Sequence, residues 1–117
     1  MHEMGVMLNI VERAERHART NGAKKVGSLT LQIGELSGVV PAYLERCWNH
    51  AVESTLLEGC NLVIETVDGV LKCNDCGNEF LGLENVKNDT SECPQCHSKH
   101  WQVISGRELT IKEIGIY

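Results

Sequence analysis

Apolar residues recur at three- and four-residue steps along the first segment of the chain, residues 3–20. They are Met4, Met7, Leu8, Val11, Ala14 and Ala18. Because an α-helix has 3.6 residues per turn, this spacing forms one apolar stripe and predicts an amphipathic helix. Asn21-Gly22 follows, and glycine just past a helix tolerates the left-handed conformation that ends it. We therefore expect this helix to end near Thr20.

Three later segments have the two-residue period of half-buried strands, and a second helical stripe lies between the first two. The strands are residues 26–33, 61–67 and 108–117. In the last strand the apolar phase changes, which predicts a bulge near residues 112–113 or an end that leaves the sheet.

The second helix is predicted to begin at Pro41, where the first turn accepts a residue without an N–H. Its stop is predicted at Glu58-Gly59. The stripe consists of Leu44, Cys47, Trp48, Ala51, Val52, Thr55 and Leu56.

These elements predict an α+β fold in which two helices pack on a small three-stranded sheet. An inserted segment rich in cysteine precedes the last strand. We expect an α+β domain of residues 1–68 plus 107–117 and an inserted domain of residues 69–106. The inserted domain has few apolar residues, so a metal ion must supply much of its folding energy.

Four cysteines of the inserted segment form two identical Cys-x-x-Cys pairs, Cys73 with Cys76 and Cys93 with Cys96. Sixteen residues separate the pairs, which is typical of a four-thiolate zinc site. Four thiolates at about 2.3 Å fill a tetrahedral shell and leave no place for water or substrate. The pattern therefore predicts a zinc ribbon with a structural Zn²⁺ rather than a catalytic one.

Other interpretations explain the cysteines less well. Cys93 to His97 also matches the string of c-type haem attachment, and either pair alone fits a thioredoxin-like redox motif. Haem attachment normally requires export, but the amphipathic first residues do not resemble a signal peptide. Both interpretations leave the other pair unexplained. The remaining cysteines, Cys47 and Cys60, have apolar neighbours and are interpreted as small buried hydrophobic residues.

Composition narrows the classes of partner. The chain has 117 residues and a formal net charge of −5, which disfavours nucleic acid as the main partner. No apolar run approaches the roughly 20 residues that span a bilayer, so no membrane association is expected. Six cysteines without an export signal favour the reducing cytoplasm.

The amino terminus, Met1-His2-Glu3, is a second candidate metal site. A free α-amine, the His2 amide nitrogen and the His2 imidazole would close adjoining chelate rings on one ion, a geometry that favours Cu(II) or Ni(II). Glu3 would add a carboxylate oxygen or its own amide. The alternative is an ordinary chain end, with Glu3 as a first-turn acid favoured by the helix dipole.

Taken in order, these motifs resemble the HypA/HybF family of hydrogenase maturation factors. The resemblance rests on Met1-His2-Glu3, Ile33-Gly34-Glu35-Leu36-Ser37, Glu58-Gly59-Cys60 and the paired cysteines, and it runs over essentially the whole chain. It implies a nickel metallochaperone and not an enzyme.

The family implies a division of labour between two metals. His2, Glu3 and the Met1 amine would hold Ni²⁺ as transferable cargo, and the four cysteines would hold Zn²⁺. The implied partners are a GTPase of the maturation pathway and the precursor of the [NiFe]-hydrogenase large subunit, with urease as recipient in some relatives. His97 and His100 would be at most auxiliary ligands during transfer.

Two other functions remain as alternatives at this point. One is a zinc-ribbon module that binds protein or nucleic acid without delivering nickel. The other, a zinc hydrolase or deaminase, needs an open metal position and a nearby His-x-Glu, and the chain lacks both around its cysteines. Oligomeric state is open, and strand exchange would permit a homodimer.

Overall fold

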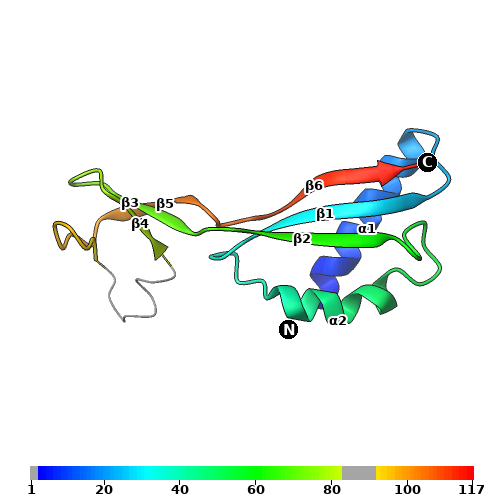
Figure 1. Ribbon diagram of the computed structural model, residues 1–117, viewed down its shortest axis with the longest axis horizontal. Coiled ribbons are helices and arrows are strands. Elements are labelled where there is room, and N and C mark those ends of the chain that lie inside the picture. Colours follow the sequence, from blue (N-terminus) through cyan, green and yellow to red (C-terminus); the bar gives the residue numbers. More distant parts are fainter. Residues whose placement is uncertain (1–2, 83–91) are drawn as a thin grey trace. The chain divides into compact units, whose positions relative to one another are not determined.

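The structure, a computed structural model, describes residues 3–82 and 92–117 (Figure 1). It divides into two compact units. The first contains Met1–Gln32, Val39–Glu65 and Thr110–Tyr117, and the second contains Ile33–Gly38 and Thr66–Leu109. The domain boundaries expected from the sequence stay a prediction. Neither helix within the described ranges is long and apolar enough to cross a membrane.

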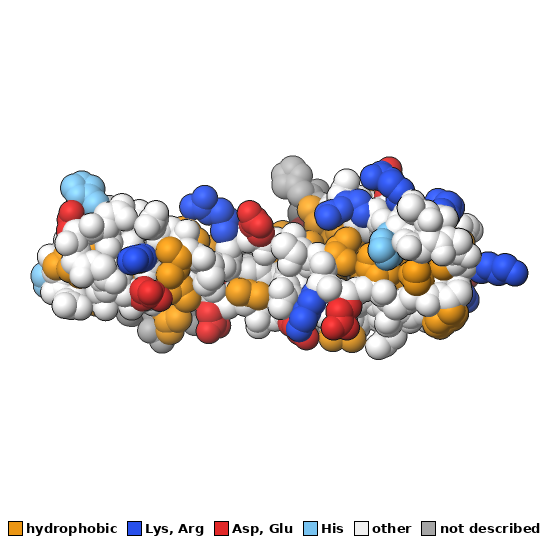
Figure 2. All heavy atoms as spheres, turned by 90° about the horizontal axis from the view of Figure 1, so that it is seen from above, with side chains coloured by type: hydrophobic (Ala, Val, Ile, Leu, Met, Phe, Trp, Pro, Cys, Tyr) orange, Lys and Arg blue, Asp and Glu red, His pale blue; other side chains and the backbone are white. Residues whose placement is uncertain are grey.

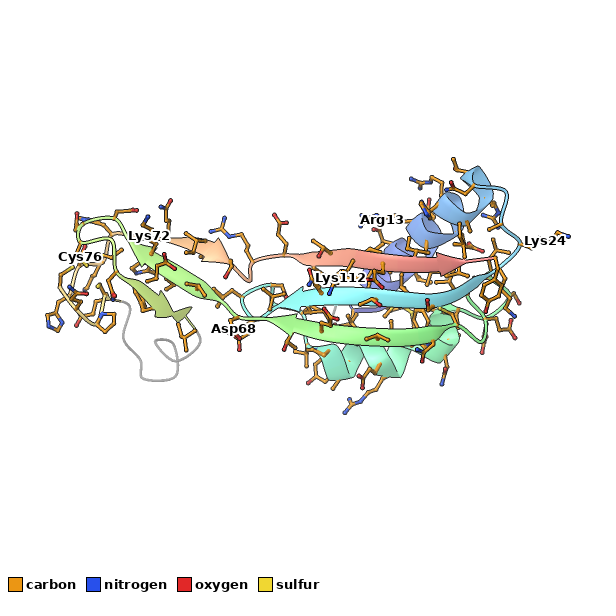
Figure 3. All side chains as sticks on the ribbon, turned by 45° about the horizontal axis from the view of Figure 1, so that its top comes forward. Arg13, Lys24, Asp68, Lys72, Cys76 and Lys112 are labelled. Atoms are coloured by element: carbon orange, nitrogen blue, oxygen red, sulfur yellow. The ribbon has the colours of Figure 1, made fainter. Side chains whose placement is uncertain are left out.

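The first unit is built from two helices and a three-stranded sheet, as the sequence predicts. The sheet has the order β2-β1-β6. Both helices lie on one face of it (Figures 1 and 3). The elements are α1 (Glu3–Thr20), β1 (Val26–Gly34), α2 (Pro41–Ala51), β2 (Asn61–Val67) and β6 (Leu109–Ile116).

Backbone hydrogen bonds fix the direction of the strands. Lys25 and Tyr117 exchange N–H···O bonds of 3.0 Å in both directions, so β6 runs antiparallel to β1. β2 runs in the same direction as β1 (Figure 3), which is possible because α2 forms the crossover between them. In β6 the adjacent Lys112 and Glu113 are both exposed, which is where the sequence predicted a phase change.

Large aliphatic side chains fill the space between the helices and the sheet. The fully buried ones of this unit are Met7, Ile10, Val26, Leu29, Leu31, Leu44 and Leu57. The buried stripe of α1 differs from the predicted one. Leu8 is 49% exposed, whereas Ile10 and Glu3 are buried. The buried face of α1 is therefore rotated relative to the predicted one, and the Glu3 carboxylate lies at its first position.

The prediction that α2 continues to Glu58 was wrong, because the helix ends at Ala51. Ser54 has a left-handed φ of 61°, which no helix interior accommodates. The Thr55 hydroxyl donates to the Val52 carbonyl at 2.7 Å. Side chains of this kind compete with helical hydrogen bonds. Beyond Ala51 the chain forms a series of turns, and these turns still place an apolar side chain, Leu57, in the core.

The second unit contains an antiparallel sheet of order β4-β3-β5, formed by β3 (Val70–Cys73), β4 (Glu79–Leu81) and β5 (Trp101–Ser105). Leu71 of the central strand pairs with Phe80 on one side and Val103 on the other. Among the described residues of this unit, the largest fully buried side chains are only Ile33, Cys73 and Cys93. The unit thus has little apolar core.

The Ile33–Gly38 segment packs tightly on the base of this sheet. The Glu35 carboxylate accepts a 2.8 Å hydrogen bond from the Gly69 N–H, and the Leu36 N–H donates to the Gly106 carbonyl at 2.7 Å. A Cβ on Gly34 would overlap the Gly106 backbone. Glycine is required here because two backbones approach within the space of one methyl group.

Candidate metal centres

Two similar turns present the four cysteines. The first lies between β3 and β4, where the Cys73 N–H donates to the Asn78 carbonyl at 2.8 Å and the Gly77 N–H donates to the Cys73 carbonyl at 3.0 Å. The second repeats this pattern, with Cys93 bonded to Ser98 and His97 bonded to Cys93, both at 2.8 Å. Cys76 marks the first turn in Figure 3.

His97 takes the place in the second turn that Gly77 takes in the first. Their φ angles are 62° and 78°, so both residues close their turns in the left-handed region. Histidine is among the non-glycine residues that tolerate this conformation. The sequence position of His97, directly after a Cys-x-x-Cys pair, is therefore explained by the turn as well as by any interaction of its imidazole.

The turns bring the four sulfurs together, with every ligand atom within 4.8 Å of the others. Cys73 Sγ lies 3.5 Å from Cys96 Sγ, and Cys76 Sγ lies 3.6 Å from Cys93 Sγ. Four sulfurs bound tetrahedrally at about 2.3 Å would lie about 3.8 Å apart. The cluster has the donor set and spacing of a four-thiolate zinc site and combines both pairs, unlike the haem and redox interpretations.

Hydrogen bonds from N–H groups to the cysteine sulfurs favour the thiolate form of the cluster. The Cys76 N–H donates to Cys73 Sγ at 3.5 Å, and the Gln95 N–H donates to Cys93 Sγ at 3.4 Å. The Asn78 side-chain amide also donates to Cys93 Sγ, at 3.7 Å. Bonds of this kind stabilise thiolates and orient metal ligands.

The pKa values of the thiols diverge because the sulfurs crowd one another. Burial raises the pKa of Cys93, but N–H groups of Cys96 and Gln95 outweigh burial and bring it to about 6. A Ser98 hydrogen bond lowers the pKa of Cys96, but the neighbouring thiols, Cys73 first, raise it to about 12. Four thiolates at this distance repel one another, so all four ionise together only around a cation.

Two histidines lie beside the cluster and contact carboxylates. His97 Nδ1 lies 3.2 Å from Glu92 Oε1, and His100 Nδ1 lies 3.3 Å from Asp75 Oδ2. The Ser98 hydroxyl donates to Asp75 and lowers the pKa of that carboxyl, with His100 contributing. Both imidazoles are exposed, and Figure 2 shows histidine side chains on this surface. An auxiliary metal role for them stays a prediction.

At the amino terminus, Met1 and His2 lie outside the described residues. Glu3, the first residue of α1, is 8% exposed. Its Oε2 is buried and has no hydrogen-bond partner within the described part of the chain. The predicted stripe began at Met4 and left Glu3 out, although residue 3 lies four positions before the buried Met7 and therefore in phase with the core.

The other two cysteines differ in burial. Cys60 is buried, as predicted, and burial raises the pKa of its thiol. Cys47 is only half-buried, so its interpretation as a core residue was wrong. It follows Tyr43 by one helical turn and lines a cavity together with Glu3 and Met4 of α1.

A protein-family model described as "Hydrogenase/urease nickel incorporation, metallochaperone, hypA" matches residues 1–116 of this chain. Curated relatives carry the name hydrogenase maturation factor HypA. The Geobacter metallireducens protein is 42% identical over 116 residues, covering 99% of both chains. The Chlorobium limicola protein is 39% identical and covers 99% of this chain and 97% of its own.

Solved structures give the same result. The solution structure of the Ni metallochaperone HypA from Helicobacter pylori matches with a TM-score of 0.70 and 27% identity, covering 99% of this chain and 97% of that one. A second solution structure, of a HypA protein, matches with a TM-score of 0.64 and 27% identity, covering 100% and 97%.

Proposed function

This chain belongs to the HypA family of metallochaperones for hydrogenase and urease nickel incorporation, and we propose that it binds Ni(II) at its amino terminus and delivers it for [NiFe]-hydrogenase maturation. The observation that carries this proposal is the family match over residues 1–116, which includes Met1-His2-Glu3. In this proposal Met1, His2 and Glu3 bind the cargo ion. The protein transfers an ion and catalyses no reaction.

The position of Glu3 supports a terminal nickel site. The first N–H groups of an α-helix have no intrahelical acceptor. The Glu3 amide is therefore available to complete a tetragonal set begun by the Met1 amine, the His2 amide and the His2 imidazole. Ligands at a chain end also detach one at a time, which suits an ion that must be released.

The cysteine cluster has a different role in the proposal. Cys73, Cys76, Cys93 and Cys96 hold a structural Zn²⁺ that stabilises the second unit. A closed thiolate shell has no open position for cargo. Because folding and metal binding are coupled in such small modules, release of this ion would unfold the unit.

The proposed partners are a GTPase of the maturation pathway and the hydrogenase large-subunit precursor, in the cytoplasm. Urease is the alternative recipient that the family description names. A zinc-ribbon module without nickel delivery is not favoured, because the full-length relatives are named as maturation factors. A net charge of −5 also disfavours nucleic acid.

The decisive experiment measures nickel and zinc per chain in His2→Ala. We expect nickel to fall by about one equivalent while zinc stays unchanged, because only the terminal site loses its imidazole. His17→Ala is the matched control, since His17 is an exposed histidine of α1. Equal nickel in His2→Ala and the parent chain would exclude the terminal site.

An extension of several residues before Met1 tests the amine itself. It moves the free amine too far from the His2 imidazole for the two to close adjoining chelate rings on one ion, so nickel affinity should fall while zinc stays bound. If the extended chain bound nickel as tightly as the native one, the terminal amine would not be a ligand.

A further inference from the structure

A cavity lies between the first turn of α1 and the outer side of α2, within the first unit. It has a volume of about 340 Å³ and is lined by Glu3, Met4, Tyr43, Arg46 and Cys47. On α2, residues three and four positions apart share one face, so Tyr43, Arg46 and Cys47 line the same wall. The cavity thus combines a carboxylate, a thioether and a thiol next to the amino terminus.

The Glu3 carboxylate points to a ligand in this cavity. Burying a carboxylate oxygen without a partner is costly unless a proton or a cation compensates it. Glu3 is more than nine-tenths buried, and no described residue bonds its Oε2. Position 3 continues the apolar stripe of α1, where an apolar residue would pack best. A glutamate at this position is therefore better explained by binding a ligand than by packing in the core.

Cys47 supplies the second donor. It is half-buried and unpaired in disulfides, and it lines the same cavity as Glu3. Thiolate and thioether ligands favour soft and borderline metal ions, and a carboxylate adds a harder donor. The cavity also has room for water molecules that would complete the coordination shell.

The charge of the cavity suits a divalent cation. The Glu3 carboxylate and a Cys47 thiolate carry two negative charges. An ion with two positive charges balances them. The Arg46 guanidinium is exposed and lies over the Tyr43 ring, 5.2 Å from its centroid, so it is directed to the ring and not to the carboxylate.

We propose that this cavity is a second, sulfur-containing position for the cargo Ni(II), with Cys47 and the Glu3 carboxylate as ligands and Met4 as a weak third. The choice of Ni(II) as the bound ion rests on the proposed function, in which nickel is the cargo. On binding, the Cys47 thiol releases its proton to water and the thiolate bonds the metal. Glu3 joins the two positions, since its amide belongs to the terminal set and its carboxylate to the cavity.

The experiment adds nickel chloride to the zinc-loaded full chain with its native amino terminus. We expect a near-ultraviolet thiolate-to-nickel charge-transfer band in the parent chain and in Cys60→Ser, and its loss in Cys47→Ser. Zinc is counted in parallel to show that the cluster is intact and the variants are folded. No band in the parent chain, or an equal band in Cys47→Ser, would overturn the proposal.

The alkylation rate of Cys47 is an independent test that needs no substitution. Nickel should slow the reaction of Cys47 with N-ethylmaleimide at least about tenfold, since a metal-bound thiolate is no longer a free nucleophile. The buried Cys60 in the same sample is the control. An unchanged rate at Cys47 with nickel bound to the chain would contradict the assignment.

The variants separate failure of this inference from failure of the proposed function. If His2→Ala keeps all its nickel and the band, the terminal site fails and the cavity stands. If Cys47→Ser keeps all its nickel and the parent shows no band, the cavity fails and the terminal site stands. Loss of about one equivalent in His2→Ala with the band retained supports both.

Discussion

The two units of this protein are stabilised by different means. The first has a core of aliphatic side chains between two helices and a sheet, and Leu29, Leu31 and Leu44 in it are fully buried. In the second, two of the three largest fully buried side chains among the described residues are cysteines of the cluster. One unit can therefore fold by burying apolar surface, whereas we expect the other to depend on an ion held by its cysteines.

This difference between the units indicates which of them could release a bound ion without unfolding. An ion released from the cysteine cluster would remove the main support of its unit. An ion released from the first turn of α1 leaves the aliphatic core intact. The proposed division between a scaffold metal and a cargo metal thus agrees with which unit has an aliphatic core of its own.

The largest effect should come from Cys73→Ser, which breaks the four-thiolate shell. Zinc binding contributes about 10–16 kcal/mol in small modules of this kind, so the second unit should unfold. Amide hydrogen exchange should show loss of protection in β3 and β5 and retained protection in α1 and β1. Cys60→Ser is the control, and protected β3 amides in the Cys73 variant would contradict the comparison.

The next effect should come from Leu31→Ala in the aliphatic core. Truncating a fully buried leucine should lower the free energy of unfolding by about 2–5 kcal/mol. Urea denaturation followed by circular dichroism measures it, and zinc content should not change. Leu8→Ala, at a side chain that is 49% exposed, should cost less than about 1 kcal/mol. Similar losses in both variants would mean that burial does not set the stability of this unit.

A smaller effect isolates the close backbone contact at the base of the second unit. Gly106 and Gly38 have φ angles of 81° and 80°, but a Cβ would meet the Asp68 and Gly69 backbone only at Gly106. Alanine costs about 1–2 kcal/mol at either position through its φ alone. Overlap should add about 1–3 kcal/mol at Gly106. Equal unfolding free energies of the two alanine variants in zinc-saturated buffer would show that the contact relaxes freely.

The smallest effect concerns a polar row across the first sheet. The Glu65 carboxylate accepts from Lys112 at 3.0 Å and from Gln32 at 3.4 Å, and Figure 3 marks Lys112 on β6. The Lys112 hydrogen bond, followed by that of Gln32, lowers the pKa of Glu65.

Because the folded-state pKa is the lower one, the contribution to stability is present above the ordinary glutamate pKa. It is lost as pH falls through the folded value. Lys112→Met should raise the pKa of Glu65 and remove this part of the pH dependence. NMR titration of the Glu65 side chain measures it, and an unchanged pKa in the variant would exclude the ion pair as the cause.

Much of the architecture could be predicted from local patterns. The bounds of α1 and β2 match the prediction, because helical periodicity, Asn21-Gly22 and strand alternation are signals within short windows. The C-terminal end of α2 could not be predicted. Its apolar spacing continues past Ala51, and only the left-handed backbone at Ser54 and the local Thr55 hydrogen bond end the helix.

The sequence by itself determined the family of this protein and the ligand types that it offers, through the cysteine spacing and the Met1-His2-Glu3 motif. Such signals lie within a few residues of each other, and ligand type follows from side-chain identity alone. Tertiary structure alone decided that Glu3 is buried and that Cys47 shares a cavity with it. Those facts depend on how α1 and α2 pack, because residues more than forty positions apart meet only in the folded chain.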